Sequence, residues 1–237
     1  IITTTGSAGY GVLVYFSSNN NNLYSNNITT SGNTSYGEYI LYYSNNNNLY
    51  SNIITTSGNT SYGAFLSENS INNSVYSNTI TTSGQYAYAT ELVSNSNSNQ
   101  LYSNTITTSG LINGYGAYLH SSSNSNQLYN NTIHAIGFGI GHGALLSSSS
   151  NNNLSSNTIT TTGSTDYGAN GLILQSSSNN NNIYGNTISI NGNDGNGVFF
   201  HSSSNNTISN NIITVNGTTD GVGPFFGAGA FLHLSSN

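Results

Sequence analysis

The stretch LYSNTITTSG, residues 101–110, recurs along this chain with few changes. Close copies stand at 23–32 (LYSNNITTSG) and 49–58 (LYSNIITTSG). The isoleucine of the N-x-I-T phrase marks each copy. The markers are Ile28, Ile54, Ile80, Ile106, Ile133, Ile159, Ile188 and Ile213, with Ile2 as a truncated first copy, at spacings of 25 to 29 residues. A nearly fixed period in this range indicates a solenoid, in which each repeat contacts only its neighbours.

Within one period the apolar residues form strand-length groups and never follow the i, i+3, i+4 spacing of a helix. Five residues before each marker stands Leu23, Leu49, Val75, Leu101, Leu128, Leu154, Ile183 or Ile208. Nine residues earlier stands Val14, Ile40, Leu66, Leu92, Leu119, Leu145, Leu174 or Phe199. Three inward rows on three short strands describe one turn of a parallel β-helix. Parallel crossovers are normally right-handed. We therefore predict that residues 1–237 form one all-β domain, a single-stranded right-handed parallel β-helix of about nine turns.

An asparagine stands two residues before every marker. Asparagine tolerates the left-handed conformation of a sharp corner, and its amide can bond to the same amide one turn away. We therefore predict a structural asparagine ladder at a corner, formed by Asn26, Asn52, Asn78, Asn104, Asn131, Asn157, Asn186 and Asn211.

The segments GAYLHSSSNSNQLYNNTI (116–133) and GVFFHSSSNNTISNNII (197–213) carry a resemblance to a known family. They resemble the right-handed parallel β-helix repeat proteins, particularly the NosD-like and cell-surface versions with repeats of the type G-x-x-L-x-x-S-x-x-N-x-I-x-x-N-x-I. The resemblance covers essentially the whole chain and implies the same fold. It implies no single function, because this fold hosts lyases, hydrolases, tailspikes, adhesins and sheath-like surface proteins.

The composition excludes several classes of function. The chain contains no lysine or arginine and has a formal net charge of −6, so nothing could neutralise the phosphates of a nucleic acid. No apolar run approaches the roughly 20 residues that membrane insertion requires. Cysteine is absent, which excludes disulfides and thiolate metal sites. Neither end offers a capping helix, so we expect a domain uncapped at both ends, either a segment of a longer repeat array or a subunit that pairs head to tail.

Three aspartates near the C-terminus form the one candidate metal site. Asp166, Asp194 and Asp220 follow their markers by seven, six and seven residues in three consecutive turns, where stacking would let them share a calcium ion. The alternative is three solvated turn residues, because TDYG, NDGNG and TDGVG are turn-like. No other cofactor is expected.

The remaining titratable residues suggest no catalytic site. Glu38, Glu68 and Glu91 are scattered over their repeats, and Glu38 would point inward if Ile40 belongs to the core. The five histidines share no spacing suited to a metal. His120 and His201 both precede SSSN, three turns apart. We therefore predict no catalytic residue and a protein that is not an enzyme.

Two kinds of outward row could meet a partner. One is a tyrosine row four residues before the markers, formed by Tyr24, Tyr50, Tyr76, Tyr102, Tyr129 and Tyr184. A second apolar stripe is expected from Tyr15, Tyr39, Leu41, Phe65, Tyr118, Ile173 and Phe200. Such strips usually mark interaction surfaces, here for another protein or for neutral sugars, although the rings could equally stack only on one another.

Threonines flank the markers, as in the pairs Thr79 and Thr81, and Thr105 and Thr107. Regular threonine arrays resemble ice-binding faces, although threonine is also simply a good exposed strand residue. Among the Asn-x-Ser/Thr sites, Asn33 and Asn59 are candidates for glycosylation if the protein is exported.

The leading hypothesis is a non-enzymatic extracellular β-solenoid that self-assembles, head to tail or laterally, into a cell-surface filament, sheath or adhesin. The alternative is a β-helix protein that binds or cleaves carbohydrate. A third hypothesis is an ice-binding protein.

Overall fold

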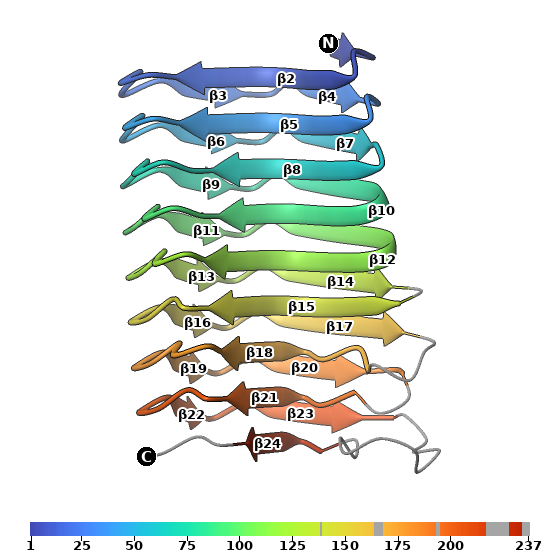
Figure 1. Ribbon diagram of the computed structural model, residues 1–237, viewed down its shortest axis with the longest axis vertical. Helices are drawn as coiled ribbons and strands as arrows, with labels where there is room; N and C mark the ends of the chain where they lie inside the picture. The colour runs from blue at the N-terminus through green and yellow to red at the C-terminus, as the bar shows by residue number, and fades with distance from the viewer. Residues whose placement is uncertain (138, 164–167, 193–194, 217–227, 234–237) are drawn as a thin grey trace.

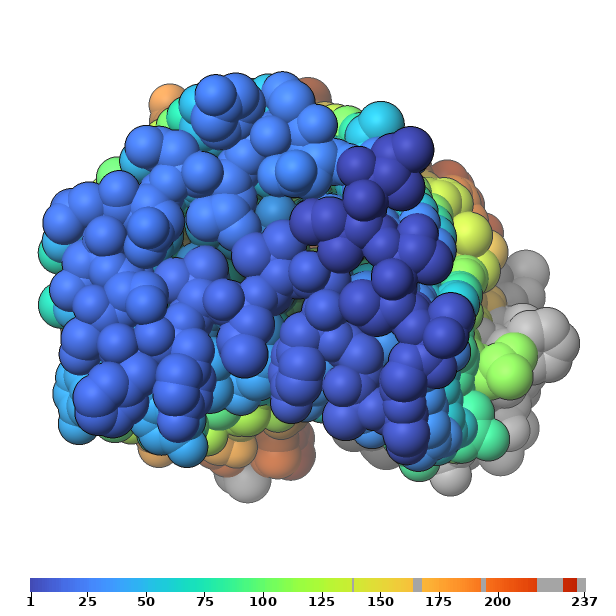
Figure 2. Space-filling model, turned by 90° about the horizontal axis from the view of Figure 1, so that it is seen from above, coloured from blue at the N-terminus to red at the C-terminus, as the bar shows by residue number. Residues whose placement is uncertain are grey.

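The computed structural model describes residues 1–137, 139–163, 168–192, 195–216 and 228–233. Its regular elements are all strands; the described residues contain no helix and therefore none that could span a membrane. The strands stack along one axis, with the first turn and β24 (Ala230–His233) at opposite ends (Figure 1). Seen along that axis, the first turn covers most of the turns beneath it (Figure 2). The chain is a parallel β-solenoid, as the repeat predicts.

Each turn contributes a strand to each of three faces. The marker face, which carries the marker isoleucines, contains β1 (Ile2–Thr4), β4 (Asn27–Thr30), β7 (Ile53–Ser57), β10 (Thr79–Leu92), β12 (Thr105–His120), β14 (Thr132–Gly137), β17 (Thr158–Gly163), β20 (Thr187–Ile190) and β23 (Ile212–Val215). The long face contains β2 (Ala8–Tyr15), β5 (Thr34–Leu41), β8 (Thr60–Leu66), the second halves of β10 and β12, β15 (Ile140–Ser147), β18 (Leu172–Gln175), β21 (Val198–His201) and β24. The short face contains β3 (Asn22–Tyr24), β6 (Asn48–Tyr50), β9 (Ser74–Tyr76), β11 (Gln100–Tyr102), β13 (Gln127–Tyr129), β16 (Asn153–Ser155), β19 (Asn182–Tyr184) and β22 (Thr207–Ser209).

Pairing between turns is parallel throughout the described strands. Because β10 and β12 continue around a corner, they join the marker and long faces into one 16-stranded sheet, beside the 8-stranded short face. The marker isoleucines pair with one another from Ile2 to Ile213, which confirms the period. A register shift between Gly84 and Tyr86 of β10 accommodates one extra residue in the facing turn. The described strands make eight complete turns between β1 and β24, in agreement with about nine predicted.

The core is a stack of inward rows. The marker isoleucines from Ile28 to Ile188 are at most 2% exposed and pack against the inward rows of the other two faces. The long face approaches the marker row so closely that a Cβ at Gly37 would collide with Ile54 Cγ2. Glycine therefore stands at this place in most turns, and the exception in β10 is the small Ala89, which is fully buried. The solenoid stays thin enough to be filled by few apolar residues.

Two residues predicted to be inward, Leu145 and Phe199, are not. The inward positions of their strands are Leu146 and Phe200, which pair with Leu119 and Leu174. The corner between the long and short faces is one residue shorter in these two turns. Counting back nine residues from the short-face row therefore reaches the residue just before the inward one. For the same reason Phe200, predicted to face outward, is buried in the core.

The predicted asparagine ladder is confirmed. Asn104 is typical: its Nδ2 donates to Asn131 Oδ1 at 3.0 Å and to the Val75 carbonyl at 2.8 Å, while its Oδ1 accepts from the backbone and side-chain nitrogens of Asn78. The predicted left-handed conformation of these asparagines is wrong, because the preceding residue takes it instead; Ser103 has a φ of 55°. That residue makes the bend, which leaves each ladder asparagine free to point its amide inward.

A second asparagine ladder runs along the other end of the short face. Asn73 is typical: its backbone N–H donates to Asn99 Oδ1 at 2.8 Å, and its Nδ2 donates to the Ser44 carbonyl. The members are Asn21, Asn47, Asn73, Asn99, Asn126, Asn152, Asn181 and Asn206. Each stands seven residues before a marker, so an invariant sequence position was available to predict this ladder.

Candidate functional site

The long face carries two outward rows of mostly aromatic side chains, together called the aromatic face. One row consists of Tyr10, Tyr36, Tyr62, Tyr88, Tyr115 and His142. The other consists of Leu13, Tyr39, Phe65, Glu91, Tyr118, Leu145, Ile173 and Phe199. Glu91 is thus the one carboxyl side chain in a row of apolar and aromatic neighbours.

Ring contacts hold the aromatic face together. Tyr36 stacks on Tyr62 with centroids 4.7 Å apart and on Tyr39 at the same distance, while Phe65 meets Tyr39 edge-on at 4.8 Å. Tyr118 stacks on His120 at 4.1 Å with an angle of 16° between the ring planes. Pairs of this kind contribute about 0.5–1.5 kcal/mol each beyond the area they bury. The rings therefore form a rigid frame around Glu91.

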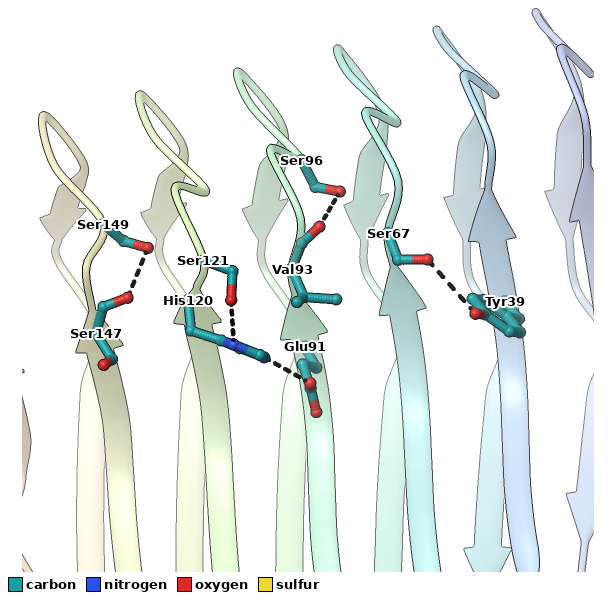
Figure 3. Close-up of polar contacts among 9 residues, drawn as sticks. All are labelled: Tyr39, Ser67, Glu91, Val93, Ser96, His120, Ser121, Ser147 and Ser149. Carbon is teal, nitrogen blue, oxygen red and sulfur yellow. Dashed lines mark hydrogen bonds and ion pairs between the residues drawn. The ribbon is translucent and has the colours of Figure 1, made fainter.

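A carboxylate, an imidazole and a hydroxyl are joined by two successive hydrogen bonds beside this frame (Figure 3). Glu91 Oε1 is 2.8 Å from His120 Nε2, and His120 Nδ1 is 3.0 Å from Ser121 Oγ. Glu91 belongs to β10, His120 ends β12, and Ser121 begins the corner that follows. The three side chains, called the Ser121 relay, come from two neighbouring turns.

Burial sets the charge state of the groups around the relay. It raises the pKa of the Glu91 carboxyl, and the hydrogen bond and charge of His120 oppose that rise. Burial, together with the nearby Tyr39, Tyr10 and Glu91, raises the pKa of Tyr36 to about 12. The phenols near Glu91 therefore stay protonated near neutral pH, while His120 favours the ionised carboxylate.

Two other titratable groups lie deep in the structure. Glu38, which the sequence places inward, is 1% exposed, and neither carboxyl oxygen has a hydrogen-bond partner. Burial raises the pKa of Glu38 to about 8. His142 is also buried, which lowers its pKa to about 3, and its Nδ1 accepts a hydrogen bond from the Asn170 backbone N–H. Both side chains are neutral near pH 7.

The predicted tyrosine row lies on the short face as a continuous stack. From Tyr24 to Tyr129 the centroids of successive rings are 4.8–5.0 Å apart, with planes within 8° of parallel. Ser155 interrupts the row, and Tyr184 resumes it. Because each inner ring has neighbours on both faces, the stack offers a partner mainly ring edges and hydroxyls. That it is an interaction surface stays a prediction.

The other predicted site residues are not brought into a common site. Asp166, Asp194 and Asp220 lie outside the described residues, so the calcium site stays a prediction. Among the residues that are described, no three His, Asp or Glu side chains form a group that could hold a metal ion. Asn33 and Asn59 are exposed at the corner between the marker and long faces, which is accessible to a glycan.

Sequence reasoning missed the Ser121 relay. Its members are 29 and 1 residues apart, and Glu91 meets His120 only because the turns stack. One signal was available: Glu91 occupies a repeat position where the neighbouring turns carry Phe65 and Tyr118. A charged residue in an aromatic row calls for a partner.

The fold and its ladders define a parallel β-solenoid repeat protein. The family model described as "Right handed beta helix region" matches residues 112–237. This chain belongs to that right-handed β-helix family, which confirms the predicted fold and hand. No curated protein and no solved structure that we compared matches the chain significantly. Membership leaves catalysis open, because many members of the family are not enzymes while some cleave carbohydrate.

Proposed function

We propose that this chain is an extracellular structural β-solenoid that self-associates into a larger cell-surface assembly. The proposal rests on how the chain uses its invariant repeat positions: two asparagine ladders run through successive turns, and a tyrosine stack runs from Tyr24 to Tyr129. The two asparagine ladders and the tyrosine stack make each turn depend on its neighbours. Such an architecture provides a stiff rod with long, regular sides.

Exposed aromatic side chains at the corner between the long and short faces support self-association. Phe16 and Tyr43 are 67% and 56% exposed, and Tyr15, itself exposed, contacts Phe16 and Tyr42 with ring centroids 5.9 and 5.5 Å away. This group, the aromatic corner, contains no charge. Contiguous exposed apolar groups usually mark protein contacts. Since the chain has no lysine or arginine to pair with its own acids, contact between copies would rest on rings and hydrogen bonds.

Negative-stain microscopy and sedimentation of the purified chain test this proposal. We expect filaments or defined oligomers, and a shift toward monomers in the double variant Phe16→Ser/Tyr43→Ser. The matched control, Thr79→Ser/Thr105→Ser on the marker face, should assemble as the unchanged chain does. Stable monomers of the unchanged chain at high concentration would overturn the proposal.

Carbohydrate binding is the weaker alternative. Sugars stack on exposed ring faces, but the inner rings of the tyrosine stack cover one another. Glycosidic cleavage normally requires two carboxylates flanking the bond. Among the described residues, no second carboxylate influences the pKa of Glu91. Glycan-array binding that Tyr76→Ala and Tyr102→Ala abolish would favour this alternative over the structural role.

Ice binding is supported only by the threonines of the marker face. Thr79, Thr105 and Thr132 are exposed at the same position of three successive turns. Ile53 interrupts this row in the preceding turn, and His134 interrupts the parallel row that contains Thr81 and Thr107. Ice crystals that grow with unmodified shape in the presence of the protein would remove this hypothesis.

A further inference from the structure

The Ser121 relay has the exposure gradient of a nucleophile, a base and an orienting acid. Ser121 is exposed at the surface, while the side chains of His120 and Glu91 are 22% and 8% exposed. A hydroxyl is a weak nucleophile unless a base within hydrogen-bond reach accepts its proton and a third group orients that base. The two distances of 3.0 and 2.8 Å meet that requirement.

The arrangement also fixes which imidazole nitrogen acts as the base. An ionised carboxylate only accepts hydrogen bonds, so we assign the His120 proton to Nε2, which donates to Glu91. The lone pair of Nδ1 then faces the Ser121 hydroxyl. The Tyr118 ring, stacked at 4.1 Å, holds the imidazole in this plane. Glu91 and Tyr118 are therefore positioning residues.

The chain itself offers a comparison. His201 and Ser202 repeat the His–Ser pair at the equivalent corner, and Ser202 shares the left-handed backbone of Ser121, with φ of 50° and 52°. The position equivalent to Glu91 in the preceding turn is Ile173. Phe199 stands farther from His201, with centroids 6.1 Å apart. Ser94 follows Val93 and has no imidazole beside it. Among the described turns, the complete relay occurs at Ser121.

We propose that the Ser121 relay hydrolyses uncharged, activated carboxylic esters through an acyl-serine intermediate. Ser121 Oγ attacks the ester carbonyl carbon, and its proton moves to His120 Nδ1. The carbon–oxygen bond to the leaving group breaks, and Nδ1 returns that proton to the departing oxygen. Water then attacks the acyl-serine and gives a proton to Nδ1, which passes it to Ser121 Oγ as the carboxylic acid leaves. Ser121 and His120 are the catalytic residues, and Glu91 takes no part in the proton transfers.

The surroundings restrict the substrate. The Tyr118 ring presents apolar surface against His120, and the chain holds no lysine or arginine to attract an anion. General-base assistance contributes about 10²–10⁴-fold, whereas a single oxyanion donor contributes about 10²–10³-fold in kcat. Because the relay supplies the first effect and the described contacts identify no donor pair for the second, we expect hydrolysis of aryl esters and not of amides.

Labelling with a fluorophosphonate probe, followed by peptide mass spectrometry, tests the proposal on the unchanged chain. We expect Ser121 to react at least about 100-fold faster than Ser202, which lacks the acid. p-Nitrophenyl acetate should give a burst of p-nitrophenolate that Ser121→Ala abolishes and that Ser202→Ala leaves unchanged. Because Ser121 is exposed, Ser121→Ala should keep the melting temperature of the unchanged chain.

The role of Glu91 has its own readout. Glu91→Gln removes the carboxylate that accepts the His120 Nε2–H hydrogen bond, so labelling of Ser121 should slow while labelling of Ser202 stays unchanged. A purely structural role for Glu91 would lower the melting temperature without slowing the labelling of Ser121 relative to Ser202. Equal labelling of Ser121 and Ser202, or no labelling of Ser121 in the folded unchanged chain, overturns the proposal.

Discussion

The neutral carboxyl of Glu38 in the core makes stability depend on pH. Glu38 lies in register between Val12 and Ala64 on the inward side of β5, and neither of its oxygens has a partner. Burial alone raises its pKa, from an ordinary value of 4.5 to about 8. Tyr36 and Tyr39 of the same strand belong to the outward aromatic face. No charged group of the described residues contributes to the shift.

The direction of this pH dependence follows from whether the folded or the unfolded chain binds the Glu38 proton. Between pH 4.5 and 8 the folded chain holds the Glu38 proton and the unfolded chain has released it, so the free energy of unfolding falls as pH rises. The stabilisation is complete below pH 4.5 and lost above pH 8. A shift of this size corresponds to about 5 kcal/mol across that window, at about 1.4 kcal/mol per pKa unit.

Denaturant unfolding at pH 4.5, 6 and 8 measures the effect in the unchanged chain and in Glu38→Gln. The amide does not ionise, so the difference in unfolding free energy between the two proteins should change by about 5 kcal/mol across the window. The unchanged chain should lose stability relative to Glu38→Gln as pH rises. Glu68→Gln, at a half-exposed corner, is the control and should keep the pH slope. Parallel curves for the unchanged chain and Glu38→Gln would refute a neutral, unpartnered carboxyl.

The buried His142 makes the free energy of unfolding depend on pH in the opposite direction. Its pKa is lowered by burial from 6.5 to about 3, so the unfolded chain binds a proton first as pH falls below 6.5 and stability declines. Between pH 4.5 and 6.5 the two effects cancel, so together they give a flat stability maximum over that range, with a decline on either side. In His142→Gln the acid-side decline should weaken while the alkaline-side decline remains.

Three substitutions, measured by chemical denaturation, and one ion removal, measured by thermal unfolding, test the rest of the structure. Asn104→Ala strips partners from the Val75 carbonyl and from Asn78, and we expect a loss of about 3–5 kcal/mol; a loss below 1 would contradict the ladder's role. Thr56→Val removes a buried hydroxyl without a partner at constant shape, and we expect a gain of about 1 kcal/mol, whereas a loss would indicate that water satisfies it. Tyr76→Leu removes two stacking contacts, and the expected cost is about 1–2 kcal/mol, with no cost if the stack contributes nothing. If the three predicted aspartates hold structural calcium, chelation should lower the melting temperature; an unchanged value would count against that site.

Much of this fold could be predicted from the sequence because each sequence repeat corresponds to one turn of the solenoid. A stack of identical turns places each residue beside its counterpart, so period alone gives the parallel register of Ile80 with Ile54 and Ile106. It also gives the asparagine ladder, since an amide repeated at strand spacing can bond to itself. The errors at Leu145 and Phe199 arose where corners change length, which no repeat count reveals.

The repeat in the sequence is enough to predict the solenoid, its first ladder and its inward rows except at Leu145 and Phe199, because these features depend on contacts between equivalent positions of neighbouring turns. Contacts between unlike positions came from the three-dimensional fold. It placed Glu91 against His120 and Ser121, left the Glu38 carboxyl without a partner, and turned the faces of the tyrosine rings toward one another. The physical reason is that a repeat fixes how far one turn lies from the next, whereas the path around each corner fixes which different side chains meet.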